Sequence, residues 1–368
     1  MRRILPMSRS LIASLAMVAI SLLAVSCNEN MERMAKDYQS GVALVQTIEY
    51  YEMVLGNGNS LYFTGSDFDK QTGEFVGVYG ELDSLVPDVM YGTGFFVSDD
   101  GMLATNRHVV EGNVTEKEAR QGLSKILYAI EDALEELKDE YLEYKMNMAS
   151  LIVQNPDTVP GSLQGQKDAF EYFTQTLEEI EELASLFKHL DVSDIDLKYH
   201  NDVRIAYNNT FVNTMGDLKP CTIREKSDTD DLAIIQLNTK QTPEGRHIFK
   251  LTPRDMLQHY SFGEFLSHLI GADKNEELMM IGFNYGPGMP SDEGLVAQHP
   301  TGSISQYVAK SREVQYRIPA LVGTSGSPVI NRRGQLVAIQ YAGSADESNQ
   351  FNYGIKEKYL HKLINNLK

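Results

Sequence analysis

The segment 323–330 reads Gly-Thr-Ser-Gly-Ser-Pro-Val-Ile and presents one serine, Ser325, between two glycines. A serine hydroxyl is a weak nucleophile unless a neighbouring base removes its proton. Ser325 therefore has a chemical role only if the chain also supplies a histidine and a carboxylate. Candidates for both lie upstream.

The candidate base is His108 and the candidate acid is Asp231. Residues 92–110 read as a strand, an Asp-Gly turn and a second strand, and His108 follows at the end of this predicted β-hairpin. Asp231 stands directly before the apolar run 232–235, Leu-Ala-Ile-Ile, which is typical of a buried strand. Both side chains are thus predicted to be fixed at strand ends, where acyl transfer by a serine requires them.

The chain order of these three residues, His108, Asp231 and Ser325, is that of chymotrypsin, whereas subtilisin and the α/β-hydrolases use other orders. With these motifs the sequence resembles the trypsin-like serine proteases of the PA clan, in particular the bacterial branch of HtrA-type proteases and glutamyl endopeptidases. The residues around His108 are more similar to the HtrA-type proteases. The turn around Ser325 is more similar to the glutamyl endopeptidases.

The resemblance covers residues 40–114 and 200–368 and implies a mainly β fold of two antiparallel six-stranded barrels, with the triad in the cleft between them. It implies Ser325 as nucleophile, His108 as general base and then general acid, and Asp231 as the residue that orients the imidazole. It also implies an oxyanion hole made by the backbone NH groups of Gly323 and Ser325, and neither a cofactor nor a metal. Further matching stretches are 278–283, 301–305, 336–343, 352–355 and 359–367.

Three acidic residues compete for the role of the acid, because Asp228, Asp230 and Asp231 lie close together. The family register favours Asp231, and we expect Asp228 and Asp230 to face solvent. The spacing of these acids lacks the pattern of a calcium-binding loop, so no metal site is predicted here.

The resemblance also places five substrate-cleft residues, Pro319, Leu321, Gln340, Tyr341 and Ala342. Glutamyl endopeptidases carry a histidine where this chain has Gln340, which disfavours a preference for glutamate. No acidic residue lies in the stretch before the serine turn, which disfavours a preference for basic side chains. We predict a pocket for a small or medium apolar side chain.

The N-terminus predicts export. Basic residues precede the apolar stretch 11–25, whose length suits a signal peptide better than a transmembrane helix. Small residues before Cys27 resemble a bacterial lipoprotein processing site, which would make 1–27 a signal peptide and Cys27 the lipidated N-terminus. An ordinary cleaved signal peptide is the alternative. We predict a lipid-anchored location in the cell envelope, periplasmic or surface-exposed, with 28–39 as a tether.

Charge and cysteine usage narrow the partners further. The chain of 368 residues has 51 acidic and 33 basic residues and a formal net charge of −18, which disfavours nucleic acid and anionic lipid as partners. Of its two cysteines only Cys221 would remain beside a lipidated Cys27, so no intrachain disulfide is expected, and Cys221 is predicted to be a buried small apolar residue.

A long insertion separates the candidate base from the acid by 123 residues (231 − 108). Apolar residues at alternating steps of three and four predict a helical hairpin over 115–199, broken by prolines and a glycine near its middle. The first stripe is Leu127, Ile130, Leu134, Leu137, Tyr141, Tyr144, Met148 and Leu151, and the second is Phe170, Phe173, Leu177, Ile180, Ala184 and Phe187. We expect the aromatic members to fill the seam rather than to hold a ligand.

The other face of the first helix is acidic. It carries Glu131, Asp132, Glu135, Glu136, Asp139 and Glu140. This face is either a solvated surface or a contact for substrate, a regulator or another protomer. A shorter insertion, 56–87, contains a predicted Asn57–Gly58 hairpin turn. No PDZ domain is expected after the predicted C-terminal helix.

Two functions follow from the sequence. The first is a serine endopeptidase that hydrolyses proteins of the cell envelope. The second is a catalytically silent protein with a protease fold, which binds unfolded chains or a partner through its cleft or its helical hairpin.

Overall fold

The computed structural model describes residues 31–154, 160–188, 190, 192, 195–257, 277–288, 290–292, 294–343 and 351–367. The predicted signal peptide 1–27, with Cys27, lies outside the described residues. The chain divides into two compact units. The barrel unit comprises Met1–Ile48, Val89–Glu111 and Asn201–Lys368, and the hairpin unit comprises Glu49–Asp88 and Gly112–His200.

The first barrel is a sheet of antiparallel strands in the order β1, β5, β6, β9, β8, β7, and it is closed by pairing of β1 with β7. Its strands are β1 (Val42–Val54), β5 (Asp88–Phe96), β6 (Met102–Thr105), β7 (Asp196–Tyr207), β8 (Lys219–Lys226) and β9 (Ala233–Leu237). The apolar run after Asp231 forms β9, which is buried at every position. Its side chains pack with those of β1, β6 and β7 in an apolar core.

The second barrel closes in the order β10, β13, β14, β17, β16, β15. Its strands are β10 (Glu277–Met280), β13 (Thr301–Tyr307), β14 (Glu313–Arg317), β15 (Pro328–Asn331), β16 (Leu336–Gly343) and β17 (Asn352–Lys356). Helix α5 (Glu357–Asn365) follows β17 and buries Leu360 and Leu363 in the core. These two six-stranded barrels and the helical hairpin described below confirm the predicted fold class.

Residues 31–38 correct one prediction, because they form a helix where we expected a tether. Met31 and Ala35, one turn apart, are buried in the same core cluster as Leu360 and Leu363. The Tyr38 ring stacks on His247 with ring centroids 3.8 Å apart. The helix therefore has an apolar face, which makes the segment part of the barrel unit. The mostly polar composition of residues 28–39 hides this face.

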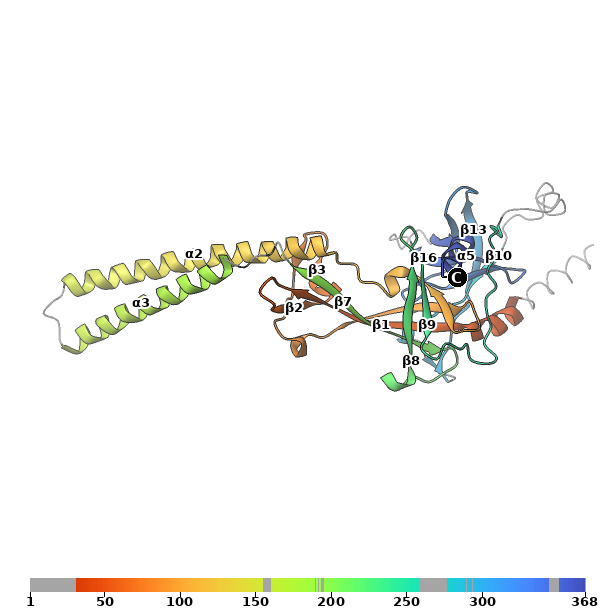
Figure 1. The fold of residues 1–368 in the computed structure, drawn as a ribbon, viewed down its shortest axis with the longest axis horizontal. Helices are drawn as coiled ribbons and strands as arrows, with labels where there is room; N and C mark the ends of the chain where they lie inside the picture. Colours follow the sequence, from red (N-terminus) through yellow and green to blue (C-terminus); the bar gives the residue numbers. More distant parts are fainter. Residues whose placement is uncertain are drawn as a thin grey trace, which may run out of the picture. The chain divides into compact units, whose positions relative to one another are not determined.

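The hairpin unit contains α2 (Glu116–Gln154) and α3 (Pro160–Lys188), which run antiparallel side by side (Figure 1). Thr115 and Glu118 begin α2 with a capping box, in which each residue's side chain accepts a hydrogen bond from the other's backbone NH. Near its start, α2 packs on small strands of the same unit, β3 (Phe68–Asp69) and β4 (Glu74–Phe75). Gly122 permits this approach, because a Cβ there would lie 2.8 Å from the Phe75 ring.

Aromatic side chains fill the seam between α2 and α3. The rings of Tyr141 and Tyr144 lie 5.9 and 5.8 Å from that of Phe173, and Lys138 pairs with Glu181 at 2.7 Å. The acidic residues predicted on the outer face of α2 are exposed. The predicted Asn57–Gly58 turn joins β1 to β2 (Ser60–Phe63), with Gly58 at φ 84°.

Candidate active site

The β5–β6 hairpin delivers His108 to the end of the first barrel. Gly101 takes the positive φ of 83° that the turn between these strands requires. A single 3-10 turn, η4 (Arg107–Val109), follows β6 and carries the histidine. Thr47 Oγ1 donates a hydrogen bond of 2.6 Å to Val109 O and so fixes this turn to β1.

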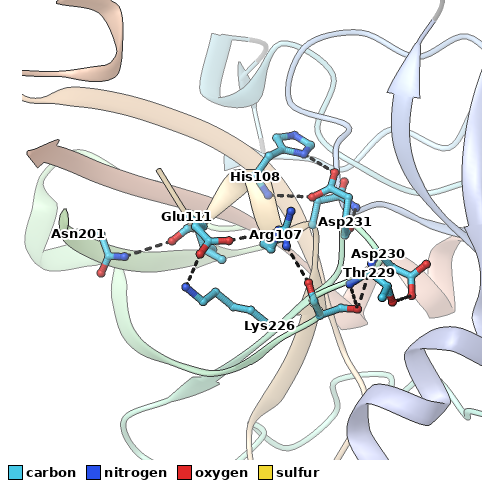
Figure 2. Close-up of polar contacts among 11 residues, drawn as sticks. Arg107, His108, Glu111, Asn201, Lys226, Thr229, Asp230 and Asp231 are labelled. Carbon is cyan, nitrogen blue, oxygen red and sulfur yellow. Dashed lines mark hydrogen bonds and ion pairs between the residues drawn. The ribbon is translucent and has the colours of Figure 1, made fainter. Parts of the chain in front are cut away.

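His108 is held by Asp231 through two contacts (Figure 2). Its backbone NH donates to Asp231 Oδ1 at 2.9 Å, and its Nδ1 lies 2.5 Å from Oδ2. An ionised carboxylate only accepts hydrogen bonds, so Nδ1 donates and Nε2 is left as the proton acceptor. The His108 and Asp231 side chains are 42% and 23% exposed, so neither is enclosed in the core of the barrel unit.

Asn106 supports the acid from the backbone side. Its Nδ2 donates to Asp231 O at 2.7 Å, and Asn106 itself is fully buried. The candidate base and acid therefore contact each other directly, and residues of the short segment 106–108 bind the acid. Sequence reasoning missed Asn106, although a polar residue two positions before the histidine was a signal.

The neighbouring acids differ from Asp231. Asp228 is exposed, as expected. Asp230 is not, because its side chain is only 8% exposed and pairs with Arg312. The prediction that Asp230 faces solvent was wrong. The residues around Asp230 do not reveal this pairing, because Arg312 lies 82 residues away in the sequence.

The Ser325 turn depends on two glycines with positive φ, Gly323 at 99° and Gly326 at 90°. A Cβ on Gly323 would lie 2.4 Å from Phe283 O, and a Cβ on Gly326 would lie 2.1 Å from Thr93 O. Only glycine fits these positions. The turn is closed by Ser327 N, which donates to Thr324 O at 2.9 Å.

The turn leaves two backbone donors available. Within the described part of the chain, neither Gly323 NH nor Ser325 NH donates a hydrogen bond to the protein. Free NH groups on either side of residue 324 are what stabilisation of a developing oxyanion requires. The two NH groups predicted to form the oxyanion hole are therefore both without a protein acceptor among the described residues.

Thr93 of β5 joins the serine turn to the first barrel. Its backbone NH donates to Ser325 O at 2.8 Å, and its Oγ1 donates to Gly323 O at 2.8 Å. The same hydroxyl accepts from Phe283 N at 3.1 Å. A Cβ on Gly92 would lie 2.7 Å from the Val109 side chain and 3.1 Å from Ser325 O, so the serine turn lies beside the segment that carries the histidine. Among the described residues, no hydrogen bond joins Ser325 Oγ to His108.

The predicted cleft residues do not form one open pocket wall. Gln340 is only 3% exposed, and its Oε1 accepts a hydrogen bond from the fully buried Tyr316. Its side chain serves the interior of the second barrel, because Tyr316 needs a buried acceptor. Pro319 is exposed, whereas Tyr341 and Ala342 are partly buried. Burial, with the carboxylates of Glu313 and Asp231 nearby, raises the pKa of the Tyr341 hydroxyl.

Apolar side chains beside the serine turn are exposed. Leu321 is 46% and Val322 81% exposed, and Val322 O accepts a hydrogen bond of 2.7 Å from the NH of Tyr285, another exposed residue. Sequence reasoning did not select Val322 or Tyr285. Such a surface suits an apolar segment of a bound chain.

Other features of the chain bear on ligands and location. No group of three or more His, Cys, Asp or Glu side chains in the described ranges is arranged to hold a metal ion. Cys221 is partly buried against the first barrel, and burial raises the pKa of its thiol to about 12. No helix within the described residues combines the length and apolar content needed to cross a bilayer.

No protein-family model matches the chain. Among solved structures, the chain is similar to a serine endoprotease from Yersinia pestis, with a TM-score of 0.42 and 11% sequence identity. The match covers 92% of this chain and 66% of that protein.

Proposed function

We propose that the protein is a serine endopeptidase that uses Ser325, His108 and Asp231. The observation that carries this proposal is the pairing of His108 with Asp231, beside a serine turn with two unused backbone donors. Both flanking glycines have positive φ, and an added Cβ at either position would clash with a backbone oxygen.

The chemistry follows from the atoms available. Ser325 Oγ attacks the carbonyl carbon of a peptide bond while His108 Nε2 takes its proton, and the NH groups of Gly323 and Ser325 receive the oxyanion. The tetrahedral intermediate collapses, His108 returns the proton to the leaving amine, and an acyl-enzyme remains. Water, deprotonated by His108, then hydrolyses the ester and regenerates Ser325. Asp231 stabilises the imidazolium in both halves.

Substrate class and location belong to the same proposal. The exposed apolar residues beside the turn, Leu321 and Val322, support cleavage of chains with small or medium apolar side chains. The sequence of residues 1–27 supports export, with a lipid anchor on Cys27. The alternative, a silent protein that binds unfolded chains or a partner, is favoured only by the helical hairpin, whose apolar residues Met146 and Val153 are exposed.

A fluorophosphonate probe, which reacts only with an activated serine, tests the proposal. We expect the mature protein to be labelled and Ser325→Ala to be unlabelled. For peptide hydrolysis, Ser325→Ala and His108→Ala should each lower kcat by about 10⁶-fold, and Asp231→Asn by about 10⁴-fold. Absence of labelling in a folded wild-type protein would favour the silent binding protein.

A further inference from the structure

The loop that carries Asp231 is fixed from the first barrel at two points. Arg107 Nη1 donates to Ser227 O at 2.9 Å, and Asn106 Nδ2 donates to Asp231 O at 2.7 Å. Arg107 is itself paired with Glu111, which also accepts from Lys226 at 2.6 Å (Figure 2). Ser227 Oγ accepts from the NH of Asp230 at 3.1 Å within the loop. Both ends of the loop are therefore held by side chains from the histidine segment.

A third point of fixation comes from the second barrel. Arg312, directly before β14, donates from Nε to Asp230 Oδ1 at 2.6 Å and from Nη2 to Asp230 Oδ2. Its guanidinium also lies over the Tyr359 ring of α5, 4.0 Å from the centroid. The Arg312 backbone is anchored as well, because its carbonyl accepts from Lys356 N at 2.9 Å. Arg312 is thus oriented by β17 and α5 before it reaches the loop.

The energetics of this pair differ from those of an ordinary surface ion pair. Asp230 is 8% exposed and Arg312 46% exposed, so the carboxylate is desolvated while the guanidinium remains partly hydrated. Bidentate pairing of a guanidinium with a carboxylate fixes orientation as well as distance. Removal of the cation leaves a desolvated anion, which must move toward solvent to be hydrated. Because Asp230 directly precedes Asp231, a movement of its backbone toward solvent would also move the acid.

We propose that Arg312 and Asp230 are positioning residues, which hold the acid Asp231 in place from the second barrel. This inference rests on the proposed function. It assigns the second barrel a role in the His108–Asp231 pair in addition to supplying Ser325. Neither Arg312 nor Asp230 touches the reacting atoms.

The pair also balances charge near the imidazole. Several charged or titratable groups surround His108 and Asp231, and they come from the histidine turn, the acid loop and the second barrel. They are Arg107, Glu111, Lys226, Asp228, Asp230, Arg312, Glu313 and Tyr341. Removal of Arg312 alone makes the surroundings of His108 more negative, which favours the protonated, inactive imidazole. Removal of the Asp230 charge alone leaves Arg312 as an unpaired cation, which disfavours the protonated imidazole.

Arg312→Ala and Asp230→Asn therefore make opposite predictions for the pH profile of kcat/KM. We expect the acid limb to move up by about half a pH unit in Arg312→Ala and down by about half a unit in Asp230→Asn. Each variant should also lose about 10-fold in kcat/KM. Arg312→Lys, which keeps the charge, should keep the acid limb of the wild type. The double variant should return the limb to its original position without recovering the rate.

Arg332→Ala is a matched control, because Arg332 is a similarly exposed arginine of the second barrel that pairs with Glu277 at 2.6 Å. It should change neither the rate nor the profile. If Arg312→Ala and Asp230→Asn fold and keep the wild-type rate, or shift the acid limb in the same direction, the positioning role is wrong while the protease function stands. An unlabelled wild-type protein in the fluorophosphonate assay would instead reject the function, and the positioning role with it.

Discussion

The two barrels of the barrel unit build their halves of the site in different ways. The polar side chains that the first barrel buries are mostly uncharged, such as Thr47, Thr105 and Asn106, and the one buried charged residue among its described residues is Glu49 of β1. It positions His108 by hydrogen bonds from side chains. The second barrel positions Ser325 by backbone conformation, and it buries three charged residues: Asp255, Lys356 and Glu357.

This difference teaches where each half is vulnerable. Where side-chain hydrogen bonds position a residue, as for His108, a single substitution removes one bond and leaves the other contacts. Where backbone conformation positions it, as for Ser325, a single added Cβ disrupts the turn, since no rotamer change relieves the clash. The interior charges of the second barrel further make its stability depend on pH, and the buried Glu49 of β1, whose pKa burial raises, has the same consequence in the first barrel.

The largest expected effect comes from adding a Cβ to the serine turn. In Gly323→Ala the new carbon would meet Phe283 O at 2.4 Å and Gly286 N at 2.6 Å, at a φ of 99°. The Gly323 NH would turn away from the oxyanion, and kcat/KM should fall by about 10²–10³-fold. Asn106→Ala, which removes one positioning side chain of the first barrel, should cost only about 10-fold, the equivalent of roughly one hydrogen bond.

Peptide hydrolysis by folded variants measures both values. Gly58→Ala provides the control for backbone strain alone, because Gly58 has a φ of 84° but no atom within 4 Å of its Cβ position. It should leave kcat/KM unchanged. Equal losses of kcat/KM in Gly323→Ala and Asn106→Ala would contradict the distinction between positioning by backbone conformation and positioning by side-chain hydrogen bonds.

The sequence predicts those features of the two half-sites that depend on residues close together in the chain. The hairpin before His108, the apolar strand after Asp231 and the glycine-flanked Ser325 are each encoded within at most about twenty residues, so periodicity and turn residues reveal them. The two-barrel fold was expected from the family resemblance that these motifs carry, and the strand order of the structure confirms it.

The remaining features depend on contacts between distant segments. The burial of Gln340 follows from Tyr316, on a different strand, and the pairing of Asp230 follows from Arg312. No local pattern marks either partner. The helix at 31–38 was missed because only two of its residues, Met31 and Ala35, are buried. Amphipathic segments of that length are difficult to distinguish from polar linkers by composition.

The second prediction concerns the charges inside the second barrel. Burial raises the pKa of Glu357 to about 8, and the nearby Asp255 adds to this, although a hydrogen bond from Thr252 NH opposes it. The folded protein thus binds a proton that the unfolded chain has already released above its ordinary value of 4.5. The stability contributed by this group is complete below about pH 4.5 and is lost as pH rises toward 8 and above.

Glu357→Gln should remove that dependence. At pH 9 the variant should be more stable than the wild type by roughly 5 kcal/mol, and near pH 4.5 the two should be close. Urea unfolding at a series of pH values measures the difference. Glu244→Gln, at an exposed glutamate, is the control and should follow the wild type at every pH. A Glu357→Gln curve parallel to that of the wild type would show that the second barrel is no more sensitive to pH than the first.

The smallest effect is expected at Thr93, which joins the first barrel to the serine turn of the second. Its side chain is fully buried, so Thr93→Val preserves the shape and removes only the hydroxyl. Gly323 O then lacks its donor and Phe283 N its acceptor, which should lower the free energy of unfolding by about 2 kcal/mol. The backbone bond from residue 93 to Ser325 O remains, so kcat/KM should fall by only about 10-fold.

Thr105→Val separates the two consequences, because Thr105 Oγ1 donates one bond, to Thr93 O at 2.8 Å, and makes no hydrogen bond to the serine turn. It should cost about 1 kcal/mol in stability and leave kcat/KM unchanged. If Thr93→Val loses stability but no activity, the turn holds its conformation through its glycines and backbone bonds alone, and the first barrel contributes only His108 and Asp231. If activity falls as well, a single threonine hydroxyl of the first barrel helps to set the oxyanion donors of the second.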